Sequence, residues 1–245
     1  MKFIAAGIAI GIAGSAAAAG EAVVYNAEDR EFEGYVAKAE NPKGSVIIVH
    51  DWDGLTDYER QRADMLAEQG YNAFAVDLYG KGVRPQSVEE NRAETEKLYS
   101  DRETMRALMT ASLETAAAED VTSPVIAGYC FGGAVALEVA RMQPEGVTGY
   151  ASFHGTIETP EGQDYSSAEA PMRIYHGGAD TGPDMMAFAT FINELEEAGT
   201  PYKAEIYAGA PHAFTVFGSD RYREEADQRS WADFLAFLGE TNPGP

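Results

Sequence analysis

The sequence predicts an α/β fold, with a mostly parallel central sheet covered by helices on both faces. The first observation behind this prediction is that short apolar runs typical of strands alternate with longer amphipathic segments typical of helices. Parallel strands need such intervening helices to connect them. The second is that no internal repeat or long low-complexity linker interrupts the alternation in 245 residues. We therefore expect residues 20–245 to form a single domain.

The first half of the alternation begins at residues 45–50 (SVIIVH), a β-branched apolar run that predicts a buried strand. Residues 56–69 predict a helix, because apolar side chains recur at helical spacing and a glycine follows as a cap. Residues 71–77 (YNAFAVD) return to strand character. The charged, alanine-rich stretch 88–118 predicts two helices, with a break near Ser100.

The second half repeats the pattern with shorter strands. Its first helix has small residues in its opening turn, its second stops at a glycine, and its last is amphipathic. The expected strands are 124–129, 147–153, 171–176 and 202–207, and the expected helices are 131–142, 184–198 and 223–238. Ligands of such sheets bind beyond the carboxyl ends of the strands, so the loops that follow the strands are where chemistry is expected.

Residues 1–19 have the pattern of a secretory signal peptide. Lys2 precedes an apolar run, and small residues follow up to an A-x-A motif that ends at Ala19. The alternative is a membrane anchor, but the run is too short to span about 30 Å of hydrocarbon. We therefore expect an exported protein, in the periplasm or secreted.

The charge balance excludes two classes of partner. The chain has 18 Lys and Arg against 40 Asp and Glu, which gives a formal net charge of −22. This charge repels phosphate backbones and anionic membranes, so neither nucleic acid nor a membrane is expected as a partner. The single cysteine excludes an intrachain disulfide and a cysteine-rich zinc site. A small-molecule ligand remains.

That cysteine, Cys130, lies in the segment GYCFGG, between a predicted strand and a predicted helix. The pattern is that of a nucleophile elbow, with cysteine in place of serine. A side chain at Gly128 or Gly132 would collide with the neighbouring strand or helix. The helix N-terminus is expected to favour the thiolate over the thiol. The alternative is a cysteine that simply packs in the core.

A cysteine nucleophile needs a base and an acid that orients it. Asp180 follows the strand 171–176, and His212 follows the strand 202–207. The order Cys130, Asp180, His212 is the order of nucleophile, acid and base in α/β-hydrolases. The alternatives are a turn residue or helix cap for Asp180 and a surface histidine for His212.

An oxyanion hole requires two backbone N–H groups near the nucleophile. The residue after the nucleophile, Phe131, supplies one candidate. Trp52, in the loop after the strand 45–50, supplies the other. Asp51 lies beside it and is a candidate to hydrogen-bond the resting thiol.

Taken together, these motifs resemble the dienelactone hydrolase family of α/β-hydrolases. The matching segments are His50-Asp51-Trp52-Asp53-Gly54-Leu55, Asp77-Leu78-Tyr79-Gly80, the Cys130 elbow, Ser152-Phe153-His154-Gly155, the Asp180 loop and Pro211-His212-Ala213-Phe214. The resemblance implies a Cys-His-Asp triad that hydrolyses a small ester or lactone through an acyl-cysteine, without a metal or organic cofactor. It also implies that Asp51, where the family usually has glutamate, holds the resting thiol.

The substrate-binding positions depart from the family pattern. The family binds the substrate carboxylate with two arginines. Lys81 stands at the first of these positions, with Arg84 nearby, and Val216 stands at the second. Arginine binds a carboxylate bidentately and lysine only as a point charge. The resemblance further places four side chains in the pocket, although packing around the elbow is the alternative for each: Trp52, Tyr79, His154 and Phe214.

Two further functions stay open at this stage. An exported protein could keep the fold to bind or sense a ligand without turning it over. Redox sensing by Cys130 is the other, but the chain holds no second cysteine to resolve an oxidised thiol.

Overall fold

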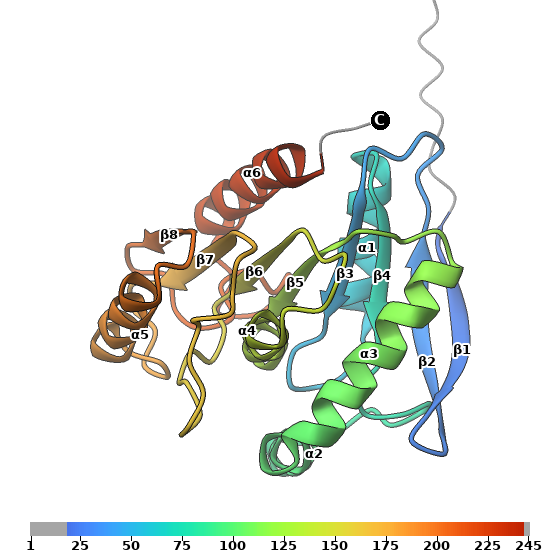
Figure 1. The fold of residues 1–245 in the computed structure, drawn as a ribbon, viewed down its shortest axis with the longest axis horizontal. Helices are drawn as coiled ribbons and strands as arrows, with labels where there is room; N and C mark the ends of the chain where they lie inside the picture. Colours follow the sequence, from blue (N-terminus) through green and yellow to red (C-terminus); the bar gives the residue numbers. More distant parts are fainter. Residues whose placement is uncertain (1–18, 243–245) are drawn as a thin grey trace, which may run out of the picture.

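The computed structural model describes residues 19–242 and confirms the predicted α/β architecture (Figure 1). The expected signal peptide, except for Ala19, lies outside these residues. The eight-stranded sheet has the order β1-β2-β4-β3-β5-β6-β7-β8. Its strands are β1 (Glu21–Ala27), β2 (Arg30–Ala37), β3 (Ser45–Val49), β4 (Asn72–Val76), β5 (Val125–Tyr129), β6 (Gly149–Phe153), β7 (Met172–Gly177) and β8 (Tyr202–Tyr207). Strands β3 to β8 pair in parallel, whereas β2 pairs antiparallel with both β1 and β4.

Helices cover both faces of this sheet. On one face, α1 and α6 pack over a core that includes Ile48 and Phe234. On the other, α2 to α5 pack over a core that includes Ile47, Met105 and Phe191. The helices are α1 (Asp57–Glu68), α2 (Val88–Ser100), α3 (Arg102–Ala118), α4 (Phe131–Met142), α5 (Met185–Ala198) and α6 (Glu224–Thr241). None of the helices described within residues 19–242 is long and apolar enough to cross a membrane.

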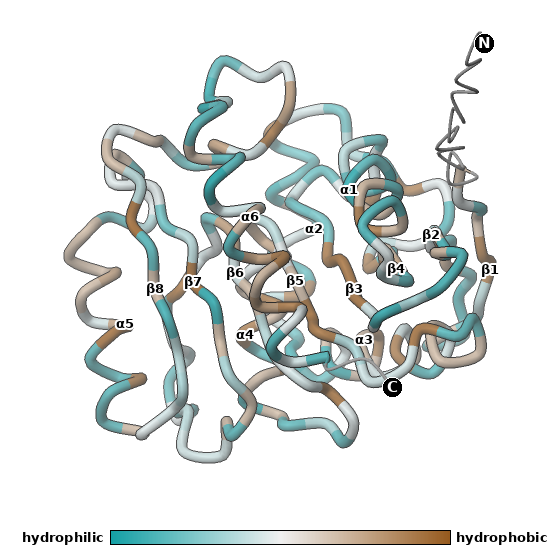
Figure 2. Tube along the Cα trace, turned by 90° about the horizontal axis from the view of Figure 1, so that it is seen from above, coloured by the Kyte–Doolittle hydropathy of each residue, from teal (hydrophilic) through white to brown (hydrophobic). Residues whose placement is uncertain are grey.

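The central strands are hydrophobic, as Figure 2 shows along β3 and β5. Every residue of β3, β4, β5 and β6 is buried. A strand covered by helices on both faces has no solvent side, so it reads as a continuous apolar run rather than an alternation. For this reason the strands expected from the sequence lie close to the strands in the structure.

The hairpin β1–β2 was not predicted. Its turn is formed by Glu28 and Asp29, whose φ angles are +47° and +56°. Such turns normally carry Asn or Gly, so the usual sequence signal is missing here. Tyr25 and Phe32 stack across the two strands, with ring centroids 5.7 Å apart, and fix one face of the hairpin on the core.

The turn between β5 and α4 has the strained backbone expected of a nucleophile elbow. Cys130 has φ +52° and ψ −112°, a conformation that L-residues rarely adopt. A Cβ atom at Gly128 would lie 1.9 Å from the carbonyl oxygen of Gly132, and one at Gly132 would lie 2.2 Å from that of Val49. The predicted collisions are therefore confirmed, because helix α4 starts in direct contact with the ends of β3 and β5.

A test of this contact compares two glycine-to-alanine variants within helices. Gly132→Ala is expected to lower the free energy of unfolding by about 2 kcal/mol or more, because a backbone oxygen occupies the space of the new methyl group. Gly239→Ala, exposed in α6 with open space around it, is expected to be stabilising by about 0.5–1 kcal/mol. Urea unfolding measures both, and equal stability of the two variants would contradict this account.

Candidate active site

The structure brings the three predicted triad side chains into one hydrogen-bonded row. The Nε2 atom of His212 lies 3.0 Å from the Sγ of Cys130, and its Nδ1 lies 2.8 Å from an Asp180 oxygen. Cys130 stands on the turn between β5 and α4, Asp180 in the loop after β7, and His212 in the loop after β8. These loops meet because the carboxyl ends of parallel strands share one edge of the sheet. The row borders a pocket of about 370 Å³.

Asp180 is held as a carboxylate. Burial alone would raise its pKa, but hydrogen bonds from His212 and from the backbone N–H of Gly182 outweigh burial and leave the pKa below its usual value. The alternative role of helix cap belongs to Asp184 instead. Its side chain accepts hydrogen bonds from the backbone N–H groups of Met186 and Ala187 in the first turn of α5. Asp180 is therefore left to orient the His212 ring.

Burial favours the neutral thiol of Cys130 and outweighs the expected effect of the helix N-terminus. Burial raises its pKa well above the usual value, and the nearby Asp51 and Asp180 raise it further. The backbone N–H groups of Phe131 and Trp52 hydrogen-bond the sulfur and lower the pKa, but by less. A neutral thiol beside a histidine can react only when the histidine removes its proton.

Those two N–H groups are the predicted oxyanion donors. Both act on the sulfur of Cys130: Trp52 from the loop after β3 and Phe131 from the first residue of α4. A carbonyl carbon bonded to the sulfur would bring its oxygen close to the same donors. The arrangement can therefore stabilise an oxyanion without any rearrangement of the backbone.

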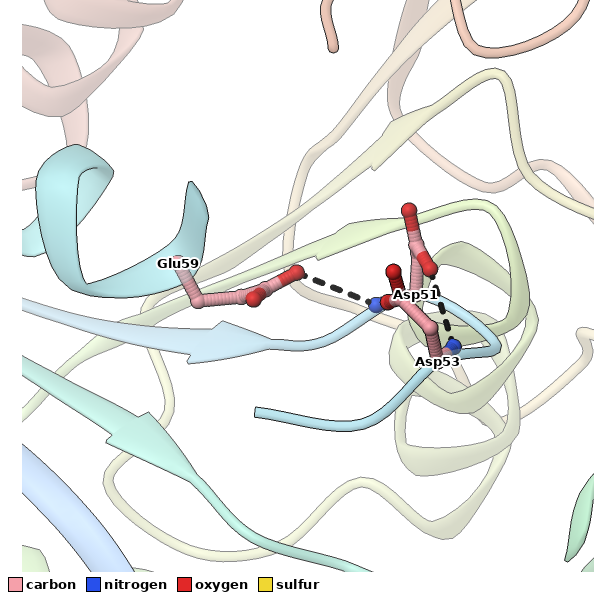
Figure 3. A group of neighbouring side chains, drawn as sticks. All are labelled: Asp51, Asp53 and Glu59. Carbon is pink, nitrogen blue, oxygen red and sulfur yellow. Dashed lines mark hydrogen bonds between the residues drawn. The ribbon is translucent and has the colours of Figure 1, made fainter. Parts of the chain in front are cut away.

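Three acidic side chains, Asp51, Asp53 and Glu59, form a cluster (Figure 3). Asp51 borders the same pocket as Cys130. Asp51 accepts a hydrogen bond from the backbone N–H of Asp53 at 3.1 Å, and Glu59 accepts one from the N–H of Asp51 at 3.4 Å. Glu59 also accepts two bonds of 2.8 Å from Thr56, as part of the capping box that starts α1. The carboxyl groups of Asp51 and Glu59 thus fix the loop after β3, which carries Trp52.

Burial opposes ionisation of two members of the cluster, Asp51 and Glu59. Burial raises the pKa of Glu59 to about 7 and holds that of Asp51 well above its usual range, with the neighbouring carboxylates adding to both shifts. One oxygen from each group lies within 4.8 Å of the others, a spacing that also suits a hard cation. The Glu59 oxygens, however, are already occupied by Thr56 and the backbone of Asp51.

The role expected for Asp51 as the residue that holds the thiol does not match this geometry. Asp51 borders the same pocket as Cys130, but its carboxylate accepts a hydrogen bond from the loop backbone, and the side chain that hydrogen-bonds the sulfur is His212.

Five predicted substrate-binding side chains lie elsewhere. Tyr79, His154 and Phe214 are buried beside the elbow and do not border the pocket, so packing, the alternative left open, is correct for them. Tyr79 donates to the carbonyl oxygen of Trp52 at 3.0 Å and thereby supports the oxyanion loop.

The two predicted cationic residues are also outside the pocket. Lys81 lies 3.7 Å from Glu31 at the surface, and Arg84 lies 3.8 Å from the buried Asp77. Each of these side chains lies beside an acidic partner and not beside Cys130.

The cation that does border the pocket is Arg221, which the sequence did not indicate. It is exposed, and within residues 19–242 its side chain makes neither an ion pair nor a hydrogen bond. Arg221 is nine residues past His212, on the loop that leads to α6, so no motif spacing pointed to it. In a chain with so many acids, an unpaired arginine at the pocket is available to a ligand.

The raised pKa of Glu59 makes the stability of the fold depend on pH. Glu59 has a higher pKa in the folded protein than the usual 4.5, so its contribution is complete below about pH 4.5 and is lost as pH rises through about 7. Glu59→Gln should reduce this loss by on the order of 2 kcal/mol between pH 5 and pH 8. Urea unfolding at both pH values measures it, with the exposed Glu68→Gln on the same helix as control. Parallel losses in all three proteins would refute the assignment.

Comparisons with known proteins agree with this geometry. A model of the dienelactone hydrolase family matches residues 32–242. A Bradyrhizobium protein provisionally named 2-oxo-3-(5-oxofuran-2-ylidene)propanoate lactonase is 28% identical over 207 residues, covering 79% of this chain and 82% of the relative. A Saccharolobus solfataricus protein provisionally named carboxymethylenebutenolidase is 23% identical over 252 residues, covering 88% and 96%.

The fold is shared with a solved structure as well. The crystal structure of a dienelactone hydrolase-like promiscuous phosphotriesterase from metagenomic libraries superposes with a TM-score of 0.82 at 24% identity, covering 91% of this chain and 98% of that one. With its mostly parallel sheet, the elbow at Cys130 and the family match across most of its length, this chain belongs to the dienelactone hydrolase family of hydrolases.

Proposed function

We propose that this protein hydrolyses a small ester or lactone through an acyl-cysteine intermediate. The observation that carries the proposal is the row from Asp180 through His212 to Cys130, which ends at a pocket. Membership of a hydrolase family and the lactonase name of one relative support the same reaction class.

The first half of the reaction starts from the neutral thiol. His212 donates its Nδ1–H to Asp180, so Nε2 is free to accept the thiol proton. As the proton moves, the sulfur of Cys130 bonds to the substrate carbonyl carbon, and the carbonyl electron pair moves onto oxygen. The N–H groups of Trp52 and Phe131 stabilise that oxyanion. Collapse of the intermediate breaks the ester C–O bond, and His212 gives its proton to the departing alkoxide.

The second half returns the enzyme to its starting state. His212 removes a proton from water, whose oxygen attacks the thioester carbonyl. The C–S bond then breaks, His212 returns the proton to the sulfur, and the carboxylic acid leaves. The row of three residues therefore serves both halves, and the proton balance needs no other group.

Two variants in the same row test the reaction. Cys130→Ala removes the nucleophile, and Asp180→Asn leaves the size of the side chain but removes the charge that orients His212. Each is expected to lower kcat on a panel of short-chain esters, thioesters and lactones by roughly a thousandfold. Asp184→Asn is the matched control, because asparagine caps a helix as well as aspartate does.

The same panel separates catalysis from a ligand-binding or sensor role. A binding protein without turnover would show no activity in the wild type and unchanged ligand affinity in Cys130→Ala. Wild-type activity that survives in Cys130→Ala would overturn the proposal outright.

Arg221 at the pocket favours a negatively charged substrate. A carboxylate on the substrate could pair with its guanidinium at the pocket, whereas a neutral substrate gains nothing from it. Arg221→Gln is expected to lower kcat/KM for a carboxylate-bearing lactone roughly tenfold, with little change for a neutral aryl ester. Arg92→Gln, which removes the same charge from the exposed face of α2, controls for net charge. Equal effects of the two variants would show that Arg221 acts only at long range.

A further inference from the structure

A second histidine packs against the His212 ring from within the core. His154 follows β6 directly, is fully buried, and has a φ of +42°, which a non-glycine residue adopts only when its surroundings hold it there. Its backbone N–H donates to Tyr175 at 2.8 Å. Its ring meets the His212 ring edge-on, with the centroids 5.3 Å apart. One side of the His212 ring is thus set by another imidazole rather than by solvent.

The His154 ring is held in turn by a chain of buried hydrogen bonds. Its Nε2 lies 2.8 Å from the Thr215 hydroxyl, which lies 2.7 Å from the Tyr58 hydroxyl. Arg62, buried in α1, donates to the Tyr58 oxygen at 3.3 Å. We call these four side chains the relay. Arg62 also donates to the backbone oxygen of Thr215 at 3.0 Å, which ties the loop that carries His212 to α1.

The hydrogen bond to Thr215 holds the His154 ring at its Nε2 atom. A guanidinium can only donate, so the Tyr58 oxygen accepts from Arg62. In the two remaining links either hydroxyl can be the donor, and His154 Nε2 takes the complementary role toward Thr215. Burial together with the neighbouring charges of His212 and Arg62 holds the pKa of His154 well below its usual value, so the neutral ring is favoured.

We infer that His154 is a positioning residue for His212 and that the relay from Arg62 through Tyr58 and Thr215 fixes its orientation. A base that shuttles a proton between sulfur, alkoxide and water must keep its Nε2 aimed within a fraction of an ångström. Asp180 fixes only the Nδ1 end of the ring, and the edge of His154 limits its remaining rotation about that bond. The effect on catalysis rests on the proposed function, whereas the contact between the two rings does not depend on it.

The relay offers a matched pair of tyrosine variants. Tyr58→Phe removes a relay hydroxyl, whereas Tyr150→Phe removes a buried hydroxyl that has no hydrogen-bond partner, at the opposite end of β6 from His154. A second pair tests the next link, since Thr215→Val removes the hydroxyl and Thr215→Ser keeps it. Tyr58→Phe and Thr215→Val should lower kcat roughly tenfold with KM within about twofold, and Tyr150→Phe and Thr215→Ser should not.

A spectroscopic readout keeps the test independent of any substrate. The chain has four histidines, so the His212 imidazole can be followed by NMR through a pH titration of the ligand-free protein. The titratable groups that face His212 are Asp180, Cys130, His154 and His176. Thr215→Val should shift its ring signals, and Thr215→Ser should restore them.

The outcomes separate the two proposals. Wild-type kcat and wild-type His212 signals in both Tyr58→Phe and Thr215→Val would overturn the positioning role, as would an equal loss in Tyr150→Phe. If Cys130→Ala retains activity, the proposed function fails, and the His212 titration still decides whether the relay positions the ring. If Thr215→Val does not fold, Tyr58→Phe carries the test, because it leaves both ends of the relay in place.

Discussion

The contact between the first turn of α4 and the ends of β3 and β5 is the constraint on which the site depends. Because Gly128 and Gly132 carry no side chain, the helix begins in direct contact with backbone oxygens of the neighbouring segments. This contact forces the positive φ of Cys130 and raises its sulfur out of the sheet. It also brings the loop after β3 beside the elbow, so that Trp52 and Phe131 donate to one atom. A looser helix would lose the nucleophile and the oxyanion donors together.

Burial and the helix N-terminus shift the pKa of the thiol in opposite directions, and burial has the larger effect. A helix N-terminus contributes about 0.3–1 kcal/mol toward the thiolate, which is less than one pKa unit. Full burial can shift a pKa by about 3–5 units in the other direction. Two acids at the pocket add to the effect of burial. A thiol of this kind stays protonated until His212 accepts its proton, so the position of His212 matters more here than the helix dipole does.

The sequence predicted the parts of the fold and site that local patterns encode. Buried parallel strands are continuous apolar runs, and the elbow is a short motif with a steric reason for each glycine, so both were located. The order Cys130, Asp180, His212 was recognisable because each residue follows a predicted strand. The hairpin β1–β2 was missed, since Glu28 and Asp29 adopt positive φ without the Asn or Gly that signals such a turn.

The parts that failed depend on which distant segments meet. Arg221 and the Thr215–His154 contact arise where the loop before α6 folds back on the site, and neither has a spacing rule. Tyr79 and Phe214 were placed in the pocket by the family resemblance, which carries no information on how each side chain packs in this chain. The side chains of Tyr79 and Phe214 are both buried in the core.

The buried carboxylates show how a chain with a net charge of −22 can still build a site. Burial opposes ionisation of Glu138, Asp180, Asp51 and Glu59. Glu138 is held ionised by three arginines of α3 and α4, and Asp180 is held ionised by His212 and a backbone N–H. Asp51 and Glu59 form no ion pair within residues 19–242, and burial raises the pKa of both. Glu59, with a pKa raised to about 7, changes its charge near neutral pH, and it accepts a hydrogen bond from the backbone of the loop that carries Trp52. The support of that loop therefore depends on pH.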